Sequence, residues 1–241
     1  MSNGLYVALS AQMAMEKRMS TIANNVANMN TPGFRAEEIK FESVMAETGG
    51  AKDVAFSSVG ESYTSRKTGA VTFTNSPNDV AIEGKAWLSI QTPAGTAYTR
   101  DGRIHVSSDG RLTTVNNYPI LDPGGTSILV DPDLGPIKIG TDGTITQGIN
   151  QVGTIGMYEI PAAAKLTRYD NAAVIPDRPA TVVQDFNSNV MRQGYVEGSN
   201  VDPILEMTRL ITVQRAFESA ASAISEQETT SVDSIRALGP Q

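Results

Sequence analysis

The sequence of 241 residues contains no cysteine and a single histidine, His105. Without thiols, the chain forms no disulfide and offers no thiolate nucleophile or sulfur ligand for a metal. One imidazole excludes metal sites that need two histidines, and any serine–histidine–aspartate arrangement would have to use His105. These two absences remove the commonest catalytic and metal-binding arrangements.

The sequence also lacks long apolar runs and an excess of positive charge. No stretch approaches the roughly 18 consecutive apolar residues that a membrane-spanning helix needs. The first lysine is Lys17, so no basic segment precedes an apolar one as in a cleaved signal peptide. Nineteen Lys and Arg against 26 Asp and Glu give a net charge of −7, which disfavours binding to nucleic acid or anionic lipid. We expect no nucleic-acid partner, no embedding in a membrane and no cleaved signal.

The residues that could carry chemistry fit structural roles better. Asp101, Asp109 and Asp142 each precede a glycine, as turn residues do, and their spacing is not that of calcium ligands. His105 lies between two apolar residues and is predicted to face outward, whereas Trp87 is predicted to anchor the core or a sheet face. No glycine-rich run follows a strand and opens a helix. We therefore predict no catalytic residue, no small-molecule substrate, no cofactor and no metal. A hydrolase that uses His105 or an aspartate pair is the enzymatic alternative.

The distribution of glycine and proline divides the chain into three parts. Both residue types are absent from 5–31 and from 204–238, which predicts a long helix in each segment. Between them, short β-branched stretches alternate with turns such as Asp101-Gly102 and Asp109-Gly110, a pattern typical of antiparallel hairpins. The sequence predicts an α+β fold in which long N- and C-terminal helices pair as a coiled coil and the central domain is mainly antiparallel β.

The expected domain boundaries follow from this division. Residues 1–40 together with 200–241 are expected to form a discontinuous helical coiled-coil domain. Residues 41–75 and 176–199 form an extended or β connecting region, and residues 76–175 form a β-rich outer domain.

Seven-residue spacings of apolar side chains predict a seam on each helix. Asp202 suits the N-cap of the second helix and Pro203 its first position. Packing of both helices on one globular core is the alternative to their pairing with each other. The predicted seam residues are Leu5, Met15, Met19, Ile22, Val26, Met207, Leu210, Phe217, Ile224, Ile235 and Leu238.

Three groups of motifs lie at the two ends and in the middle of the chain. The N-terminal group is Ile22-Ala-Asn-Asn-Val-Ala-Asn28 and Thr31-Pro-Gly-Phe-Arg35. The C-terminal group is Gly194-Tyr-Val-Glu-Gly-Ser-Asn-Val-Asp202 and Ile211-Thr-Val-Gln-Arg-Ala-Phe217, and the central group is Asp79-Val-Ala-Ile-Glu-Gly84, Tyr98-Thr-Arg-Asp-Gly102 and Gly110-Arg-Leu112. The two terminal groups resemble the N- and C-terminal signatures of the bacterial flagellar axial proteins, which build the rod and the hook. The central group is similar to the segment that rod and hook proteins share.

The resemblance implies that assembly residues lie in the terminal motifs, where asparagine side chains can offer neutral hydrogen-bonding groups to neighbouring subunits. The motif residues carried over are Ala23, Asn24, Asn25, Ala27, Asn28, Thr31, Pro32, Gly33, Phe34, Gly194, Glu197, Ser199, Asn200, Val201, Gln214, Arg215 and Phe217.

The implied function is that of a structural, non-enzymatic subunit of the flagellar rod, of the proximal-rod type. Such a protein is exported by the flagellar type III apparatus and polymerises through its terminal helices into the tubular drive shaft that crosses the periplasm. Its partners are other copies of itself and adjacent proximal-rod and distal-rod subunits. A distal-rod or hook subunit is the alternative within the class, and a soluble coiled-coil adaptor with a β head is the alternative outside it.

Overall fold

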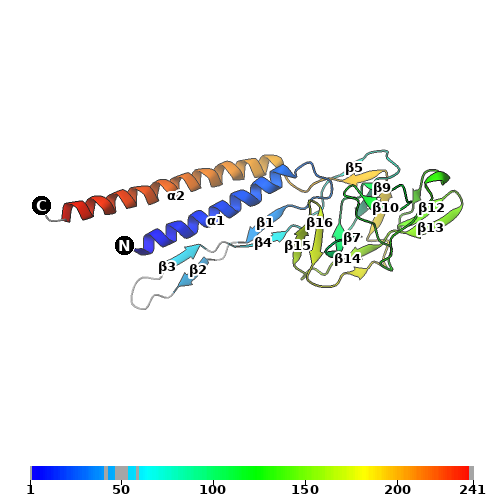
Figure 1. Ribbon diagram of the computed structural model, residues 1–241, viewed down its shortest axis with the longest axis horizontal. Coiled ribbons are helices and arrows are strands. Elements are labelled where there is room, and N and C mark those ends of the chain that lie inside the picture. Colours follow the sequence, from blue (N-terminus) through cyan, green and yellow to red (C-terminus); the bar gives the residue numbers. More distant parts are fainter. Residues whose placement is uncertain (1, 41–42, 47–53, 58–59, 239–241) are drawn as a thin grey trace. The chain divides into compact units, whose positions relative to one another are not determined.

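A computed structural model of the chain describes residues 2–40, 43–46, 54–57 and 60–238 (Figure 1). The side chains of the predicted seam residues Leu5, Ile235 and Leu238 lie outside the described part. The chain forms two compact units. The helical unit comprises residues 1–27, 37–63 and 202–241, and the β unit comprises residues 28–36 and 64–201.

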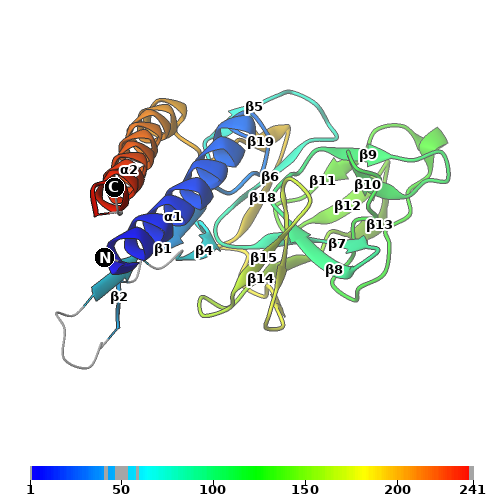
Figure 2. The same cartoon turned by 60° about the vertical axis from the view of Figure 1, so that its left-hand side comes forward.

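The helical unit contains the two terminal helices and two short strand pairs. Helix α1 (Ser2–Ala27) and helix α2 (Pro203–Leu238) contact each other. They lie side by side and run in opposite directions, so that the start of α1 and the end of α2 lie at the same end of the helix pair (Figures 1 and 2). The strands of this unit pair as β1 (Glu37–Lys40) with β4 (Glu61–Thr64), and as β2 (Ser43–Ala46) antiparallel to β3 (Val54–Ser57).

The second helix begins as its sequence predicts. The Oδ1 atom of Asp202 accepts hydrogen bonds from the backbone N–H groups of Ile204 at 3.0 Å and Leu205 at 3.1 Å. These bonds satisfy two of the N–H groups that have no partner within a first helical turn. Pro203 occupies the first helical position, where its missing N–H costs nothing. The N-cap prediction is therefore confirmed.

The first helix is shorter than its sequence predicts. It ends at Ala27, four residues before the expected end at Thr31. The chain turns there because the N–H of Thr31 donates to the carbonyl oxygen of Asn28 at 3.1 Å, and the Thr31 hydroxyl bonds to Oδ1 of Asn28 at the same distance. The backbone bond from Thr31 to Asn28 closes a tight turn in place of a further helical turn.

The β unit consists of antiparallel strand pairs. Six strands form one sheet in the order β15-β16-β8-β7-β14-β17, three form a second sheet in the order β11-β12-β13, and the pairs are β9–β10, β6–β18 and β5–β19. The elements are β5 (Val71–Phe73), β6 (Val80–Glu83), β7 (Trp87–Thr92), β8 (Gly95–Thr99), β9 (Ile104–Val106), β10 (Leu112–Thr114), the 3-10 turn η1 (Pro132–Leu134), β11 (Lys138–Ile139), β12 (Thr144–Gln147), β13 (Asn150–Thr154), β14 (Met157–Glu159), β15 (Leu166–Tyr169), β16 (Ala173–Pro176), β17 (Thr181–Val182), β18 (Val190–Gln193) and β19 (Tyr195–Glu197). The α+β class, with two terminal helices and a mainly antiparallel β part, is confirmed.

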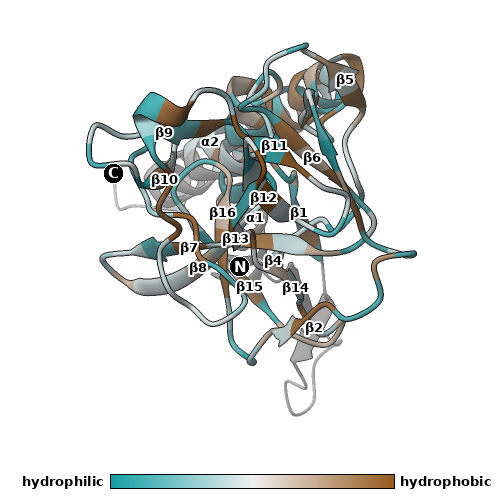
Figure 3. Cartoon of the chain, turned by 90° about the vertical axis from the view of Figure 1, so that its right-hand side faces the viewer, coloured by the Kyte–Doolittle hydropathy of each residue, from teal (hydrophilic) through white to brown (hydrophobic). Residues whose placement is uncertain are grey.

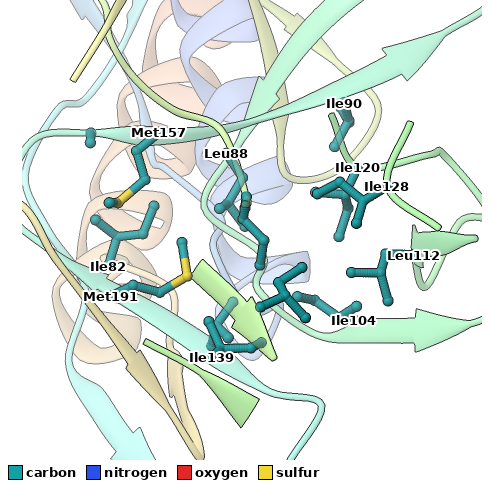
Figure 4. Packing of buried hydrophobic residues seen from close by; sticks show 14 of the residues in the cluster. Ile82, Leu88, Ile90, Ile104, Leu112, Ile120, Ile128, Ile139, Met157 and Met191 are labelled. Atoms are coloured by element: carbon teal, nitrogen blue, oxygen red, sulfur yellow. The ribbon is translucent and has the colours of Figure 1, made fainter. Parts of the chain in front are cut away.

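The larger of two hydrophobic clusters described in the β unit is drawn from strands along its whole length. Apolar stretches, brown in Figure 3, follow strands such as β6. Side chains from many strands point toward one another in Figure 4, and each is 8% exposed or less. Because these side chains come from strands distributed over the whole unit, their burial holds the short strand pairs together. The ten labelled residues are Ile82, Leu88, Ile90, Ile104, Leu112, Ile120, Ile128, Ile139, Met157 and Met191.

Two of the Asp-Gly turns, at Asp101 and Asp109, have different roles. Asp109-Gly110 lies in the turn between β9 and β10, where the N–H of Gly110 donates to the carbonyl oxygen of Ser107 at 2.9 Å. Asp101-Gly102 does not join paired strands, because β8 pairs with β7 and β16 instead of β9. Asp101 is buried there, and its carboxylate accepts two hydrogen bonds from the Arg103 side chain. The hairpin prediction is thus correct at Asp109 and wrong at Asp101.

Candidate assembly site

The turn of the N-terminal motif is built into the β unit. Gly33 adopts a φ of +69°, and its N–H donates to the backbone carbonyl oxygen of Glu197 at 2.8 Å. A Cβ atom at Gly33 would lie 2.2 Å from the backbone nitrogen of Asp101, so only glycine fits. Phe34 is completely buried, and the guanidinium of Arg168 lies 4.3 Å from the centre of its ring. The motif therefore anchors its own chain to the β unit.

A buried carboxylate joins this turn to the C-terminal motif. Oε1 of Glu197 accepts from Nη2 of Arg35 at 2.6 Å and from the N–H of Gly69 at 2.9 Å. Its Oε2 accepts from Nη2 of Arg100 at 2.6 Å and from Nε of the same residue at 2.7 Å. All three ionic side chains are 3% exposed or less. We call Arg35, Arg100 and Glu197 the Glu197 cluster.

Other donors of the Glu197 cluster bind backbone carbonyl groups, whereas Nε of Arg35 is buried without a hydrogen-bond partner among the described residues. Arg35 donates to the carbonyl oxygen of Lys67, and Arg100 donates to those of Ala86 and, at 2.7 Å, Ile82. Burial lowers the pKa of Arg35 to about 10; the attraction of Glu197 opposes this shift and the charge of Arg100 adds to it. Burial also lowers the pKa of Arg100. Both side chains remain protonated at neutral pH, so the cluster is ionic.

Asn200 adds a second link between the two motifs. Its Oδ1 accepts from the N–H of Ala36 at 2.6 Å, and its Nδ2 donates to the carbonyl oxygen of Lys67 at 2.8 Å. Its own N–H donates to the carbonyl oxygen of Phe34 at 3.3 Å. The chain segments that leave the β unit toward the two helices are therefore hydrogen-bonded to each other.

In the helical unit, Asn25 joins three elements. Its Oδ1 accepts from the N–H of Glu37 at 2.9 Å, and its Nδ2 donates to the carbonyl oxygen of Glu37 at 2.9 Å and to Oε2 of Glu206 at 3.3 Å. Asn25 is 2% exposed and Glu206 is 5% exposed, while Arg209 neutralises the Glu206 carboxylate. Asn25 thus links the last turn of α1, strand β1 and the first turn of α2. These bonds lie within its own chain, and contact of the motif asparagines with a neighbouring subunit stays a prediction.

The structure separates the other predicted motif residues into two groups. Gly194 and Val201 are buried, and Asn28, Thr31, Pro32 and Ser199 are partly buried. The exposed residues are Ala23, Asn24, Ala27, Gln214 and Arg215. The sequence analysis predicts no role for Arg35, Arg100 or Glu206. Arg35 and Arg100 lie within the motifs quoted above, and their place in these motifs could have indicated a role. No sequence feature singles out Glu206.

The predicted seam residues divide in the same way. Ile22 is buried, and Met15, Met19, Val26, Leu210, Phe217 and Ile224 are partly buried. Met207 is 45% exposed. Ala14 and Val213, which were not predicted, are buried between the helices.

The side chains that the sequence offers as candidates for catalysis or metal binding have structural positions. His105 is exposed and Trp87 is buried among aromatic and aliphatic side chains, as the sequence predicts. Within the described ranges, no group of three or more acidic or histidine residues could hold a metal ion. Neither helix, over its described residues, is long and apolar enough to cross a membrane.

Comparison with protein families identifies the class. Residues 5–35 match the family described as flagella basal body rod protein, and residues 192–233 match the C-terminal family of the flagellar basal body rod FlgEFG proteins. Residues 81–147 match the D1 domain of the flagellar hook protein FlgE/F/G family. The matched segments include α1 with the Gly33 turn, the core strands, and β19 with α2. They define a flagellar rod or hook protein.

Curated relatives narrow this class. The chain is 47% identical over 239 residues to the flagellar basal-body rod protein FlgF of Mesorhizobium japonicum, with 99% of each chain covered. It is 46% identical over 240 residues to that of Rhizobium meliloti and 35% identical over 246 residues to that of Caulobacter vibrioides, again with 99% of each chain covered. The chain belongs to the flagellar basal-body rod protein family and is of the FlgF type.

Replacing Glu197 by Gln tests the buried cluster. The variant keeps hydrogen-bonding groups but leaves two buried guanidinium groups without a counter-charge. We expect the free energy of unfolding to fall by about 3–5 kcal/mol. The measurement is urea unfolding of the β unit, followed by the fluorescence of the sole tryptophan, Trp87, whose ring lies 5.6 Å from the Arg35 guanidinium.

Glu83→Gln is the matched control. Glu83 pairs with Arg192 at 2.8 Å, but the two side chains are 43% and 48% exposed. Removing an exposed pair changes stability by less than about 1 kcal/mol. Equal losses in the two variants would contradict a special role for the Glu197 cluster.

Replacing Gly33 by Ala tests the anchoring turn. The added Cβ meets the backbone of Asp101, so we expect a loss of about 3 kcal/mol or more in the same unfolding measurement. Gly148→Ala is the control, because Gly148 has a φ of +59° and a Cβ there would have no atom within 4 Å. The free energy of unfolding of this variant should fall by only about 1 kcal/mol, which is the cost of placing alanine in a left-handed backbone conformation. If the two variants are equally stable, close packing of the Gly33 turn is refuted.

Proposed function

We propose that the chain, a structural subunit of the flagellar basal-body rod, assembles into the proximal part of the rod through its two terminal helices and has no catalytic role. Family membership supports the structural role. The assignment to the proximal rod rests on the similarity to FlgF-type relatives over nearly the whole chain.

The observation that carries this proposal is the apolar outer surface of the helical unit. Ile204 is 80% exposed and Ile211 is 53% exposed on α2, and Leu9 and Met13 are 48% and 53% exposed on α1. Leu9 and Met13 are four residues apart and therefore lie on one face of α1. Large apolar side chains gathered on the surface typically mark interaction sites, because removing them from water is favourable.

The pairing of the helices with each other is the second part of the proposal. We infer that Ile22 and Val26 of α1 and Leu210, Phe217 and Ile224 of α2 form the seam of an antiparallel coiled coil within one subunit. Ile22 is buried and the other four are partly buried, and this burial and the seven-residue spacing of the α2 positions support the pairing. Each helix then has one face toward its partner and an opposite face toward neighbouring subunits.

The domain division belongs to the same proposal. In the assembled rod, residues 1–40 and 200–241 form the inner helical layer and residues 76–175 form the outer β domain. Residues 41–75 and 176–199 connect the two. The buried core of the β unit supports an outer domain that folds by itself.

The chain can polymerise if each copy contacts the next through two different surface patches. An interface that joins two different patches of the same subunit does not close on itself, and it builds a helical tube. The proposed partners are further copies of the chain and the adjacent proximal-rod and distal-rod subunits. Delivery by the flagellar type III export apparatus, without a cleaved signal peptide, completes the proposal.

Limited proteolysis tests assembly through the helices. Trypsin cuts after Lys and Arg, and Lys17, Arg18, Arg209 and Arg215 are exposed on the two helices. In the purified monomer we expect rapid cleavage at these sites around a resistant β unit, because the helices lack the neighbours that bury them. In isolated basal bodies the same sites should resist.

Two results would count against this account. If the chain is absent from purified basal bodies, the rod assignment fails. If the helices resist trypsin in a monomer or a finite oligomer, a soluble adaptor with a closed coiled coil becomes the better explanation.

A further inference from the structure

A pocket in the β unit is lined by an excess of cationic side chains. Its volume is about 510 Å³, within the usual range for pockets that bind ligands. Trp87, Ile160 and Pro161 give it apolar walls, and Glu159 is the one carboxylate among the described lining residues. The cationic residues that line it are Arg35, Arg66, Lys85 and Arg100.

The positive charges at this pocket are only partly neutralised. Glu197, which pairs with Arg35 and Arg100, is the second carboxylate at the site. Four positive charges therefore stand against two negative ones, an excess of two in a chain whose net charge is −7. Lys85 is exposed and has no ionic partner among the described residues. An anion in the pocket can pair with Lys85 without displacing a group of the protein.

Arg66 fixes the apolar wall of the pocket. Its guanidinium donates to the carbonyl oxygens of Ile160 at 3.0 Å, of Pro161 at 2.9 Å and of Ala164 at 2.8 Å. These acceptors are neutral, so the charge of Arg66 has no carboxylate partner within the described part of the chain. The wall is thus held in place before a ligand arrives, which lowers the entropic cost of binding.

A free sheet edge borders the same pocket. Strand β17 is the last strand of the six-stranded sheet, and its residue Thr181 lines the pocket. The N–H of Val183 donates to the carbonyl oxygen of Met157 in β14 at 2.9 Å. Because backbone groups alternate in direction along an antiparallel pair, the N–H and carbonyl oxygen of Val182 point away from β14. The Val182 side chain is 40% exposed, so this edge is accessible.

We propose that the pocket and the edge of β17 together bind an extended acidic peptide segment of a partner protein. The peptide backbone pairs with Val182, and a glutamate or aspartate side chain enters the pocket. Backbone hydrogen bonds at a sheet edge provide affinity for an extended chain, and a pocket beside the edge selects the side chain. Here the excess of positive charge selects a carboxylate. The inference concerns the β unit alone and does not depend on how the terminal helices assemble.

The fluorescence of Trp87 provides the test, because it is the sole tryptophan and lines the pocket. The purified full-length chain is titrated with a five-residue peptide that alternates valine and glutamate and has both ends blocked. We expect a saturable change in fluorescence, and an affinity at least about tenfold higher than for the same peptide with glutamine in place of glutamate. Equal affinities, or no change at millimolar concentrations of the acidic peptide, would overturn the proposal.

Lys85→Gln tests the ionic contact in the pocket. The variant should bind the acidic peptide about tenfold more weakly, because it loses the cation that has no partner in the chain. Lys138→Gln is the matched control, since Lys138 is exposed on β11 and does not line the pocket. Its affinity should change less than about twofold. Equal losses in the two variants would show a general attraction of charge and not a site.

Val182→Pro tests the sheet edge. Proline removes the N–H that points away from β14, and it is tolerated at edge positions whose N–H makes no bond within the sheet. The variant should keep the urea midpoint of the unmodified chain and bind the peptide about tenfold more weakly. An unchanged affinity would refute pairing at this edge. If the variant does not fold, a peptide with methylated backbone nitrogens replaces it, and binding of that peptide as tight as that of the unmethylated one has the same meaning.

A glutamate with both ends blocked separates a peptide from a free small carboxylate. It carries the same side chain but has no extended backbone to pair with β17. We expect it to bind the unmodified chain at least about tenfold more weakly than the peptide. An affinity equal to that of the peptide would mean that the pocket is a small-molecule site, and the peptide proposal would be wrong.

Discussion

The burial of the Glu197 carboxylate between two guanidinium groups is the interaction on which the arrangement of the chain depends. Removing three charges from water is costly, and the cost is offset only when every charged atom has a well-placed partner. Glu197 meets this requirement with both arginines and with the N–H of Gly69. Because the partners come from the N-terminal motif, the central strands and the C-terminal motif, the cluster forms only when all three meet. It therefore specifies which parts of the chain come together.

The points at which the chain leaves the β unit follow from this constraint. Gly33 and Asn200 hold the two terminal segments together within that unit, so the chain leaves it at neighbouring points. Within the helical unit, Asn25 connects the end of α1 to the start of α2 through Glu206. These two helix ends are thus joined, and the helices run in opposite directions. Large apolar side chains such as Ile204 and Ile211 remain exposed on α2.

The sequence predicts the local features well and the long-range contacts poorly. The helices follow from the absence of glycine and proline, and the start of α2 follows from Asp202, because both signals act within a few residues. The end of α1 was predicted four residues too late, since the chain turns where the N–H and the hydroxyl of Thr31 bond to Asn28. The Glu197 cluster was not predicted, because Arg100 and Glu197 are 97 positions apart and no local pattern relates them. Asn25 was recognised by its motif, but its partners Glu37 and Glu206 are defined only by the fold.

Native-state hydrogen exchange of the Glu197→Gln variant tests the central claim most directly. The N–H groups of Gly33 and Asn200 donate between the two motifs, and that of Gly198 donates to the carbonyl oxygen of Ala70 beside the cluster; these three are the junction amides. The N–H of Leu112 donates within the core of the β unit. If the cluster holds the junction, the three junction amides should lose protection together, and by more than the Leu112 amide does. Junction amides as well protected in Glu197→Gln as in the unmodified chain would contradict this account.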